Sequence, residues 1–412
     1  MMSPLIANGS SLTTAGTLYY AFCGNNSTGD GTEANRSIRV SVAGSAANFR
    51  IALEAGGPGA GDSWIFTIFK NGIATALTIT ISGTDTTGSF TASAEDFAVG
   101  DTISLEVAET GTPTSRRWGA SLEYTSDTPN EQMILGFDNG FDNANPGYEW
   151  PAGRNNGVNA TEAQVGFLVA APGTVSHFYV KTTAAAGTGN STILTHRKGA
   201  ADQALTVTIS GAAEVTDQDT TNSYAVVAGN LIDISCTPVS TPNVGIYLWS
   251  FKFTPTTAGE SILAALCENI SGDEYGSLQS QGRLIETELG GTPLPAGILK
   301  SEYVDLTVAP GVGDSWNARL QNGGSSGALT VTVAETATTG NDTTHSQAVA
   351  AGDKIRFFVD ETGTAAATYA RLGVVFSTSS SAIKTWDGLA TASHKTHNGL
   401  AVASRKTING LA

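Results

Sequence analysis

Apolar and polar residues alternate along many short stretches of the chain. Residues 37–42, Ser-Ile-Arg-Val-Ser-Val, and residues 48–53, Asn-Phe-Arg-Ile-Ala-Leu, are two examples. A period of two places successive side chains on opposite faces of a strand, so these stretches predict strands with one face on a core and one in water. Asn71-Gly72 stands between the apolar runs 63–69 and 77–81, and Asn-Gly in that position predicts a β-hairpin.

One block of this pattern occurs three times, at intervals of about 125 residues. Each copy has Ala-Leu-Thr and an alternating strand, then Asp-Thr-Thr, then Gly-Asp or Gly-Asn before a second strand. The copies begin at Ala76, Ala204 and Ala328, with aspartates Asp85, Asp219 and Asp342 and turns at residues 100–101, 229–230 and 352–353. Such an internal repeat predicts three copies of one structural unit.

The repeats and their flanks predict an all-β protein. Each copy holds eight or nine short strand-like runs in about 120 residues and no long amphipathic helical run, which is typical of a β-sandwich or barrel. We expect three tandem jelly-roll-like β-sandwich modules, residues 1–126, 127–256 and 257–378. Residues 17–23, 133–137 and 262–267 are taken as their opening strands. The strand at 175–180 is matched with the strand that contains Trp64, and residues 309–316 are matched with 59–64.

Residues 379–412 have a different character. Three short units follow one another, with Lys384, Lys395 and Lys406 eleven residues apart, and each unit contains Asp-Gly or Asn-Gly followed by Leu-Ala. An eleven-residue period is also found in right-handed helical coils, but Gly, Asn and Thr at fixed places favour tight turns between short extended arms. We expect a repetitive docking tail; the alternative is a disordered tail.

Charge divides the chain into an acidic body and a basic tail. The net charge of the whole chain is -16. From residue 381 onward there are four basic residues and one acid, so the tail carries +3 and the remainder -19. An acidic body argues against nucleic acid as a partner, because phosphate binding needs a basic face. No apolar run approaches a membrane span, so no membrane insertion is expected.

The N-terminal residues and the cysteines bear on the compartment. Met-Met-Ser-Pro-Leu-Ile-Ala-Asn lacks the basic and apolar regions of a signal peptide, which predicts synthesis in the cytoplasm without one. Cys23 and Cys267 are assigned matching places in modules 1 and 3, and Cys236 is the third cysteine. We expect buried small apolar residues rather than a disulfide framework.

Two stretches resemble ligand-binding loops. Gly56 to Ser63 spaces its glycines like a phosphate loop, but Asp62 stands where a lysine is needed, so a plain Gly-rich turn is favoured. Asp138, Asp142 and Glu149 take the first, fifth and twelfth places of a calcium loop. That loop lacks its glycine at the sixth place and its ligand at the third, so no metal site is assigned.

The other polar residues give no catalytic set. Asp-Thr-Thr beside a strand is typical of a side chain that bonds its own turn backbone. None of the five histidines takes a matching place in two repeats or stands in a triad or metal spacing; they are His177, His196, His345, His394 and His397. A carboxylate pair assembled in space, as in glycosidases, stays open. No catalytic, cofactor-binding or metal-binding residue is predicted.

Two resemblances follow from these motifs. The segment Phe66-Thr-Ile-Phe-Lys-Asn-Gly72, followed by Val99-Gly-Asp-Thr-Ile103, looks like the strand–turn–strand edge of jelly rolls of the C1q/TNF type. Repeated Gly/Thr-rich sandwich modules, an acidic body and a short-repeat tail together resemble virion structural proteins of tailed bacteriophages, such as tail fibres, spikes and head-decoration proteins.

The virion resemblance implies a non-enzymatic structural role and a place in the virion. Expected partners are other copies of the chain, as a homo-oligomer and above all a trimer, together with other virion proteins and, additionally, host-surface glycans. The three modules within one chain are an alternative way to build the trimer. The competing class is a bacterial cell-surface adhesin or carbohydrate-binding protein, and an enzyme such as a depolymerase comes third.

Overall fold

The computed structural model describes residues 1–9, 11–14, 16–24, 29–155, 159–281 and 291–378, and four short strands beyond residue 384. The prediction of an all-β protein of tandem β-sandwich modules is confirmed. The described residues form strands and two 3-10 turns, η1 (Glu33–Asn35) and η2 (Glu162–Gln164), with no α-helix among them. The chain divides into two units, residues 1–378 and 379–412.

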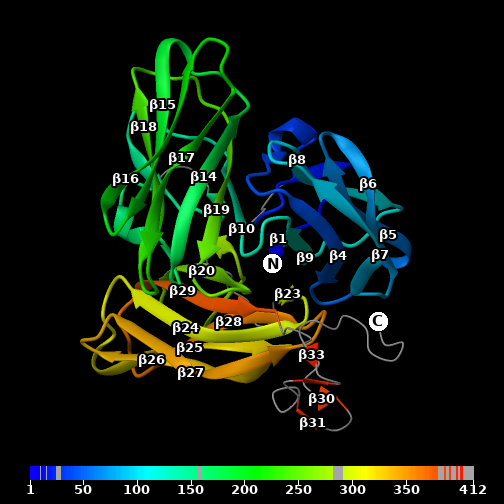
Figure 1. Cartoon of the computed structure of the whole chain (residues 1–412), viewed down its shortest axis with the longest axis vertical. Coiled ribbons are helices and arrows are strands. Elements are labelled where there is room, and N and C mark those ends of the chain that lie inside the picture. The colour runs from blue at the N-terminus through cyan, green and yellow to red at the C-terminus, as the bar shows by residue number, and fades with distance from the viewer. Residues whose placement is uncertain are drawn as a thin grey trace. The chain divides into compact units, whose positions relative to one another are not determined.

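Module 1 (residues 1–126) contains two sheets packed face to face (Figure 1). One sheet has the strand order β1-β9-β4-β7 and the other β2-β8-β5-β6, with β3 also paired to β8. The strands are β1 (Met2–Gly9), β2 (Leu18–Tyr20), β3 (Ile38–Arg39), β4 (Gly44–Leu53), β5 (Gly59–Lys70), β6 (Ile73–Gly83), β7 (Thr87–Phe97), β8 (Thr102–Thr110) and β9 (Trp118–Ser126). A four-stranded and a five-stranded antiparallel sheet in this order make a jelly-roll-like sandwich.

Module 2 (residues 127–256) repeats this order with one added strand, as β12-β10-β19-β14-β17 and β11-β18-β15-β16, with β13 paired to β18. Its strands are β10 (Gln132–Asp138), β11 (Gly147–Glu149), β12 (Gly153–Asn155), β13 (Phe167–Leu168), β14 (Gly173–Thr182), β15 (Gly187–Lys198), β16 (Ala201–Gly211), β17 (Thr216–Val226), β18 (Leu231–Val239) and β19 (Tyr247–Pro255).

Module 3 (residues 257–378) has the same plan, β22-β20-β29-β24-β27 and β21-β28-β25-β26, with β23 paired to β28. Its strands are β20 (Glu260–Ile270), β21 (Glu274–Gly276), β22 (Ser280–Gln281), β23 (Thr292–Pro293), β24 (Gly297–Leu306), β25 (Gly311–Asn322), β26 (Ser325–Glu335), β27 (Thr339–Val349), β28 (Lys354–Thr362) and β29 (Thr368–Ser377).

Two kinds of turn that the sequence predicts are present in the structure. At the β5–β6 turn, Asn71 (φ 52°) and Gly72 (φ 75°) both adopt left-handed backbone, as a two-residue hairpin requires. Before the strands β8, β18 and β28, the Asp or Asn of the repeated Gly-Asp/Gly-Asn accepts the backbone N–H three residues earlier. Those acceptors are Asp101 (2.9 Å), Asn230 (2.9 Å) and Asp353 (2.8 Å). The repeated motif is therefore a turn in which the side chain caps its own backbone.

The predicted opening strand of module 1 is wrong. Met2–Gly9, not residues 17–23, pairs with the last strand of its module, as β10 pairs with β19 and β20 with β29. Residues 17–23 instead supply β2, the equivalent of β11 and β21. β1 shows no alternation because its residues are buried on both faces, and Pro4 is tolerated because β1 is an edge strand.

Two further matches between modules are also wrong. Residues 175–180 lie in β14, which is the equivalent of β4, whereas the strand of Trp64 corresponds to β15. Cys267 lies in β20 and Cys23 follows β2, so they are not equivalent. The side chains of these two cysteines and of Cys236 are nevertheless buried, as expected, and none of the three forms a disulfide. Pro-Gly turns and apolar runs look alike at several places in one sandwich, so local pattern alone misaligned them.

The match between residues 309–316 and 59–64 is correct. Trp64 and Trp316 occupy equivalent places in β5 and β25, opposite Ile81 and Val333. Each is 1% exposed, and each indole N–H donates to a loop carbonyl, that of Thr114 at 3.2 Å and that of Ala366 at 3.1 Å.

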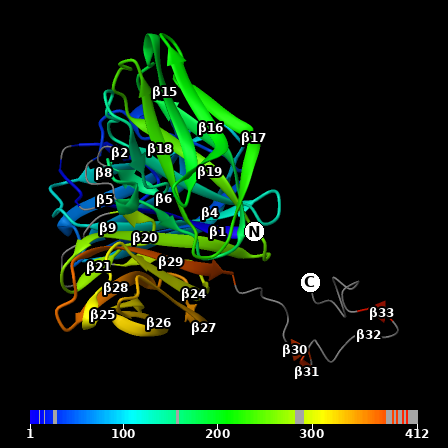
Figure 2. The ribbon, with the colours of Figure 1, turned by 90° about the vertical axis from the view of Figure 1, so that its left-hand side faces the viewer.

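In the unit 379–412, two short antiparallel pairs are present (Figure 2). β30 (Thr385–Trp386) pairs with β31 (Leu389–Ala390), and β32 (Thr396–His397) pairs with β33 (Leu400–Ala401). The extended arms predicted for the first two repeat units are therefore confirmed. Residues 406–412, the third unit, and His394 lie outside the described residues.

Candidate functional site: the contacts between modules

The opening strands of the modules serve two cores at once. Ile134 of β10 packs into the core of module 2, whereas Met133, Leu135 and Phe137 of the same strand pack into the core of module 1. In β20, Leu263 packs within module 3 and Ile262 within the core of module 2. β1 completes the pattern, because Leu5 faces its own module and Ile6 joins the core of module 3.

Each module therefore contacts the next, and the third contacts the first. The same short strand makes the contact in every case. β3 contacts β10, β14 and β19 of module 2; β13 contacts β20, β24 and β29 of module 3; and β23 contacts β4 and β9 of module 1. The equivalence of these strands is set by their pairing with β8, β18 and β28. Three head-to-tail contacts of one kind thus close on themselves within residues 1–378.

Cations link module 1 to module 2. Arg39 of β3 lies over the ring of Tyr179, 5.1 Å from its centroid, and donates from Nη2 to Gln218 at 3.1 Å. Lys181 Nζ donates to the carbonyl oxygen of Ala34 at 2.9 Å. Burial lowers the pKa of Lys181, which is the cost of bringing an ammonium into the contact. Ser250 closes the set by donating its hydroxyl to the Arg39 carbonyl at 2.5 Å.

The contact between modules 2 and 3 uses the same plan with other residues. Arg371 donates from Nη1 to the carbonyl of Ala163 at 2.6 Å, as Lys181 does to the carbonyl of Ala34, and Arg371 is also paired with Asp305. Gly373 stands where module 2 has Ser250. A Cβ at Gly373 would lie 2.5 Å from the Leu168 carbonyl oxygen, so this approach of β13 requires glycine.

A buried glutamine joins modules 2 and 3 in the manner of a strand. The side-chain amide of Gln132 donates to the carbonyl of Ile262 at 2.8 Å, and its oxygen accepts the Ile262 N–H at 2.8 Å. Gln132 is fully buried, and both of its polar groups are satisfied. Between modules 1 and 3, Asn8 donates to the carbonyl of Leu278 at 3.1 Å.

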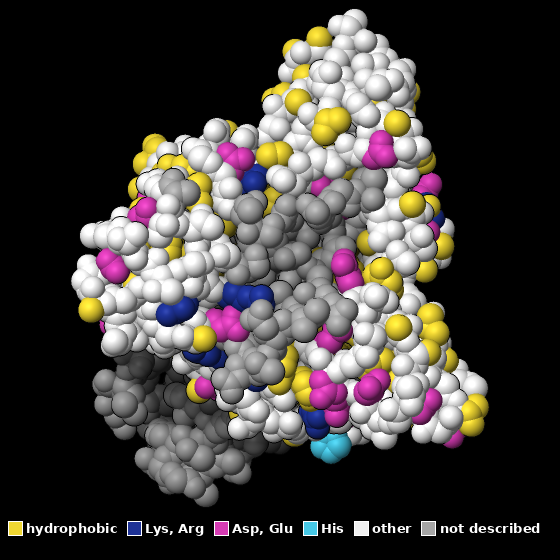
Figure 3. Space-filling view, turned by 180° about the vertical axis from the view of Figure 1, so that it is seen from behind, with side chains coloured by type: hydrophobic (Ala, Val, Ile, Leu, Met, Phe, Trp, Pro, Cys, Tyr) yellow, Lys and Arg dark blue, Asp and Glu magenta, His cyan; other side chains and the backbone are white. Residues whose placement is uncertain are grey.

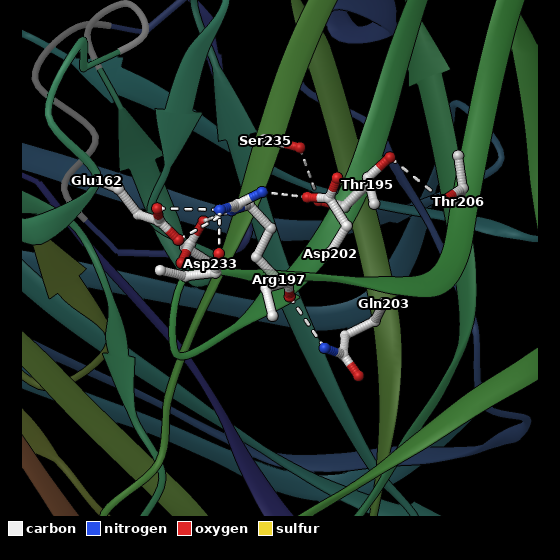
Figure 4. A network of polar contacts seen from close by, with 10 residues as sticks. Glu162, Thr195, Arg197, Asp202, Gln203, Thr206, Asp233 and Ser235 are labelled. Atoms are coloured by element: carbon white, nitrogen blue, oxygen red, sulfur yellow. Dashed lines mark hydrogen bonds and ion pairs between the residues drawn. The ribbon is translucent and has the colours of Figure 1, made fainter.

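A four-residue ionic cluster holds the segment before β13 in place (Figure 4). Arg197 forms a bidentate pair with Glu162, with N–O distances of 2.8 and 3.1 Å, and also contacts Asp202 and Asp233. Hydrogen bonding to Glu162 raises the pKa of Arg197. Burial raises the pKa of Asp233, and Glu162 adds to the effect. Because Glu162 is fixed inside module 2, its neighbour Ala163 is positioned to accept from module 3.

These interfacial cations were not found from the sequence. Arg39, Lys181 and Arg371 stand at polar places of alternating strands, where the pattern predicts exposure to water. The one available signal is the low total of 21 Lys and Arg, which makes each cation in a strand of the acidic body worth attention.

The Gly-rich stretch 56–63 is the favoured turn only as far as Pro58, because strand β5 begins at Gly59. Asp62 accepts the backbone N–H of Thr112 at 2.9 Å. Asp314 does the same for Thr364 at 2.9 Å in module 3. In modules 1 and 3 the carboxylate thus joins the start of a strand to the loop after β8 or β28, and it is not part of a phosphate cradle.

The three carboxylates of the calcium-like loop are not brought together as ligands. Asp142 is partly exposed and accepts from Ala144 N at 2.8 Å and Asn145 Nδ2 at 2.9 Å; its pKa is lowered, chiefly by Asn145. Asp138 and Glu149 are fully buried, and burial with the neighbouring Asp138 raises the pKa of Glu149. No group of three or more His, Cys, Asp or Glu side chains that could hold a metal is present among the described residues.

The match of three Asp-Thr-Thr motifs holds in two modules only. Asp219 and Asp342 lie opposite a bulge, across from Phe178 and Glu302, whereas Phe90 takes that place in module 1. Asp85 lies in the β6–β7 turn instead. Where the motif is equivalent, the predicted turn bonding is confirmed. Asp219 accepts from Thr221 N and Asn222 N, and Asp342 from Thr344 N and His345 N, at 3.0 to 3.1 Å.

The histidines of residues 1–378 do not form a common site. His196 is fully buried, with its Nδ1 3.1 Å from the Tyr224 hydroxyl, and burial lowers its pKa to about 3. His345 is exposed beside Asp342, and His177 lies at the bulge of β14. His397 lies in β32. Within residues 1–378, His196 is therefore part of the core, whereas His345 lies on the surface.

The surface and the comparisons with known proteins give no further assignment. On the face shown in Figure 3, acidic, basic and hydrophobic side chains are scattered among neutral polar ones. Among the described residues no helix has the length and apolarity to cross a membrane. No protein-family model and no curated protein matches the chain.

Proposed function

We propose that the protein is a non-enzymatic structural component of a virion, of the fibre, spike or capsid-decoration type. The closed cycle of module contacts carries this proposal. Each module uses its opening strand and one short strand to contact its neighbours, so much of the surface of each module serves to hold the three modules together. A single chain then supplies three similar bodies, as a trimer of single-module chains would.

Further copies of the chain and other virion proteins would bind through other surfaces. The tail, residues 379–412, is the segment we assign to this role, because its net charge of +3 is opposite to that of the body. Attraction between unlike charges that remain partly solvated weakens with salt. Localisation in the virion follows from the same proposal.

Immunogold electron microscopy of intact particles and of cells from the source culture tests the proposal. An antibody raised against the full chain is expected to label particles at fixed positions. Labelling confined to the cell surface would overturn the proposal and support the adhesin class instead.

Deletion of residues 381–412 tests the role of the tail. We expect the truncated chain to keep the circular dichroism spectrum of a β-sheet protein. Its affinity for particles that lack this protein, measured by co-sedimentation at low salt, should fall at least tenfold, a loss of about 1.4 kcal/mol or more in binding free energy. Exchange of Lys384, Lys395 and Lys406 for glutamine should give part of this loss. Unchanged binding and salt dependence after deletion would rule out docking by the tail.

A further inference from the structure

The three contacts between modules use equivalent strands, but different side chains occupy the equivalent positions. The second residue of the docking strand is Arg39 in β3, Leu168 in β13 and Pro293 in β23, as the pairing of these strands with β8, β18 and β28 shows. Opposite them, the equivalent places on β14, β24 and β4 hold Tyr179, Tyr303 and Arg50. An aromatic ring is thus present at two of these contacts and replaced by arginine at the third.

The first two contacts are closed by these side chains. Arg39 stacks on Tyr179 and reaches Gln218. Leu168 is 2% exposed, and Tyr303 packs against the core of module 2. At the third contact, between β23 and the strands β4 and β9 (Figure 1), the short ring of Pro293 reaches less far than either arginine or leucine.

A hollow of about 600 Å³ lies at this third contact. This volume is within the range of roughly 300–1,000 Å³ that is usual for small-ligand sites. Its lining comes from four places in the chain: Arg50 and Ile51 of β4; Thr87 to Ser89 and Thr91 of β7; Pro293 of β23; and Ala351 to Asp353 of the turn before β28. Module 1 and module 3 therefore each supply one wall.

The two walls offer unused hydrogen-bonding groups of opposite kinds. Arg50 uses Nη1 for Glu123 at 2.8 Å and for the Asn48 carbonyl at 3.0 Å, which leaves Nε and Nη2 without a partner among the described residues. Asp353 accepts from Asn322 and Ala350 through Oδ2, which leaves Oδ1 free in the same sense. The hydroxyls of Thr87, Ser89 and Thr91 lie on the same lining.

A saccharide matches this lining. Its hydroxyls both donate and accept, so they can pair with a guanidinium, a carboxylate and protein hydroxyls together, and a C–H face can lie against the ring of Pro293 on the lining. A neutral sugar is favoured over an anionic one, because Glu123 already balances Arg50 and Asp353 adds a negative charge. We infer that the hollow between modules 1 and 3 binds a neutral saccharide segment. This binding does not depend on the virion proposal.

Saturation-transfer difference NMR of the full chain tests the inference, with neutral methyl glycosides and disaccharides of glucose, galactose, mannose and N-acetylglucosamine as probes. At least one probe is expected to receive saturation. Ser89→Trp, which places an indole in the hollow, should abolish the transfer. The matched control is Asn341→Trp, since Asn341 is the equivalent exposed residue of β27, and it should leave the transfer intact.

A conservative variant separates binding from folding. Asp353→Asn keeps the turn, because Asn230 caps the equivalent turn of module 2, yet it removes the charge of the acceptor. We expect a several-fold rise in the dissociation constant of the bound probe with an unchanged melting temperature. Absence of transfer to every neutral probe, or transfer that survives Ser89→Trp in a folded protein, would overturn the inference.

Discussion

Modules 1 and 3 fill one end of the sandwich with a tryptophan, whereas module 2 fills it with Thr192, Tyr247 and Phe141, which come from two strands and a loop. Thr192 stands in β15 where the other modules have Trp64 and Trp316. Its hydroxyl accepts from the Tyr247 hydroxyl at 2.9 Å, and the ring of Phe141 lies 4.2 Å from that of Tyr247. At this position the three modules therefore share a filled core and a hydrogen-bonded polar group, but they do not share the same residue.

The comparison extends to a second core position with a different lesson. His196 of β15 occupies the place of Ile68 in β5 and Leu320 in β25. It is surrounded by the rings of Phe178 and Phe251, at 4.5 and 4.8 Å between centroids. Module 2 thus places an ionisable ring where its neighbours have aliphatic side chains, which gives that module a pH dependence that the others lack at this site.

The largest expected effect tests the tryptophan position. Trp316→Ala should lower the free energy of unfolding by about 3–5 kcal/mol, because a large buried side chain is replaced by a cavity. Thr192→Ala at the equivalent place should cost only about 1 kcal/mol, the loss of one hydrogen bond. Urea unfolding followed by circular dichroism measures both, and equal losses would contradict the comparison.

The next effect concerns His196 and acid. Because the pKa of this residue in the folded state is about 3, below its ordinary value, the unfolded chain binds the proton first as the pH falls. Stability is therefore lost as the pH falls from the ordinary histidine pKa toward 3, by about 3 kcal/mol at pH 4. His196→Leu should remove this loss.

Urea midpoints at neutral and acidic pH measure the His196 effect, with Ile68→Leu as the matched control. The control should retain the acid sensitivity of the parent, because it changes no ionisable group. Parallel pH curves for the parent and His196→Leu would show that the buried ring has no part in it.

The smallest effect has the opposite sign. Burial raises the pKa of Asp233 above its ordinary value, so the folded state retains a proton that the unfolded chain releases, and stability is lost as the pH rises through and above the ordinary aspartate range. Asp233→Ser copies module 1, where Ser104 stands at that place and donates to Glu33 at 2.6 Å. We expect the substitution to reduce this loss of stability with rising pH by about 1 kcal/mol.

Thermal melts between mildly acidic and mildly alkaline pH would detect the difference between Asp233→Ser and the parent. A steeper loss of stability with rising pH in the variant would show that Asp233 is not the group responsible.

The sequence pattern predicted the fold well but predicted poorly which strands of the three modules are equivalent. Hairpin turns such as Asn71-Gly72 and the capped Gly-Asp turns are local, so their chemistry is readable from neighbouring residues. The opening strand Met2–Gly9 was missed because both of its faces are covered, one by its own module and one by module 3. A period of two is informative only where one face meets water.

The contacts between modules were beyond the reach of the pattern for the same reason. Arg39 and Lys181 look like ordinary exposed residues of alternating strands, and only the approach of another module makes them contacts. The hollow beside Pro293 is still harder to predict from the sequence, because it exists only where Pro293 fills less space than the equivalent residues Arg39 and Leu168. No ligand-binding residue could be predicted from the sequence, because the lining of the hollow comes from four separate segments that share no local motif.

The joining of three similar modules in one chain changes how the contacts between them accumulate mutations. In a trimer of identical chains every substitution enters all three contacts together, so a change that suits a ligand at one contact disturbs the other two. Here one codon alters one contact. Proline could therefore replace arginine or leucine in β23 while β3 and β13 kept their packing, which lets two contacts preserve assembly and frees the third to acquire a chemistry of its own.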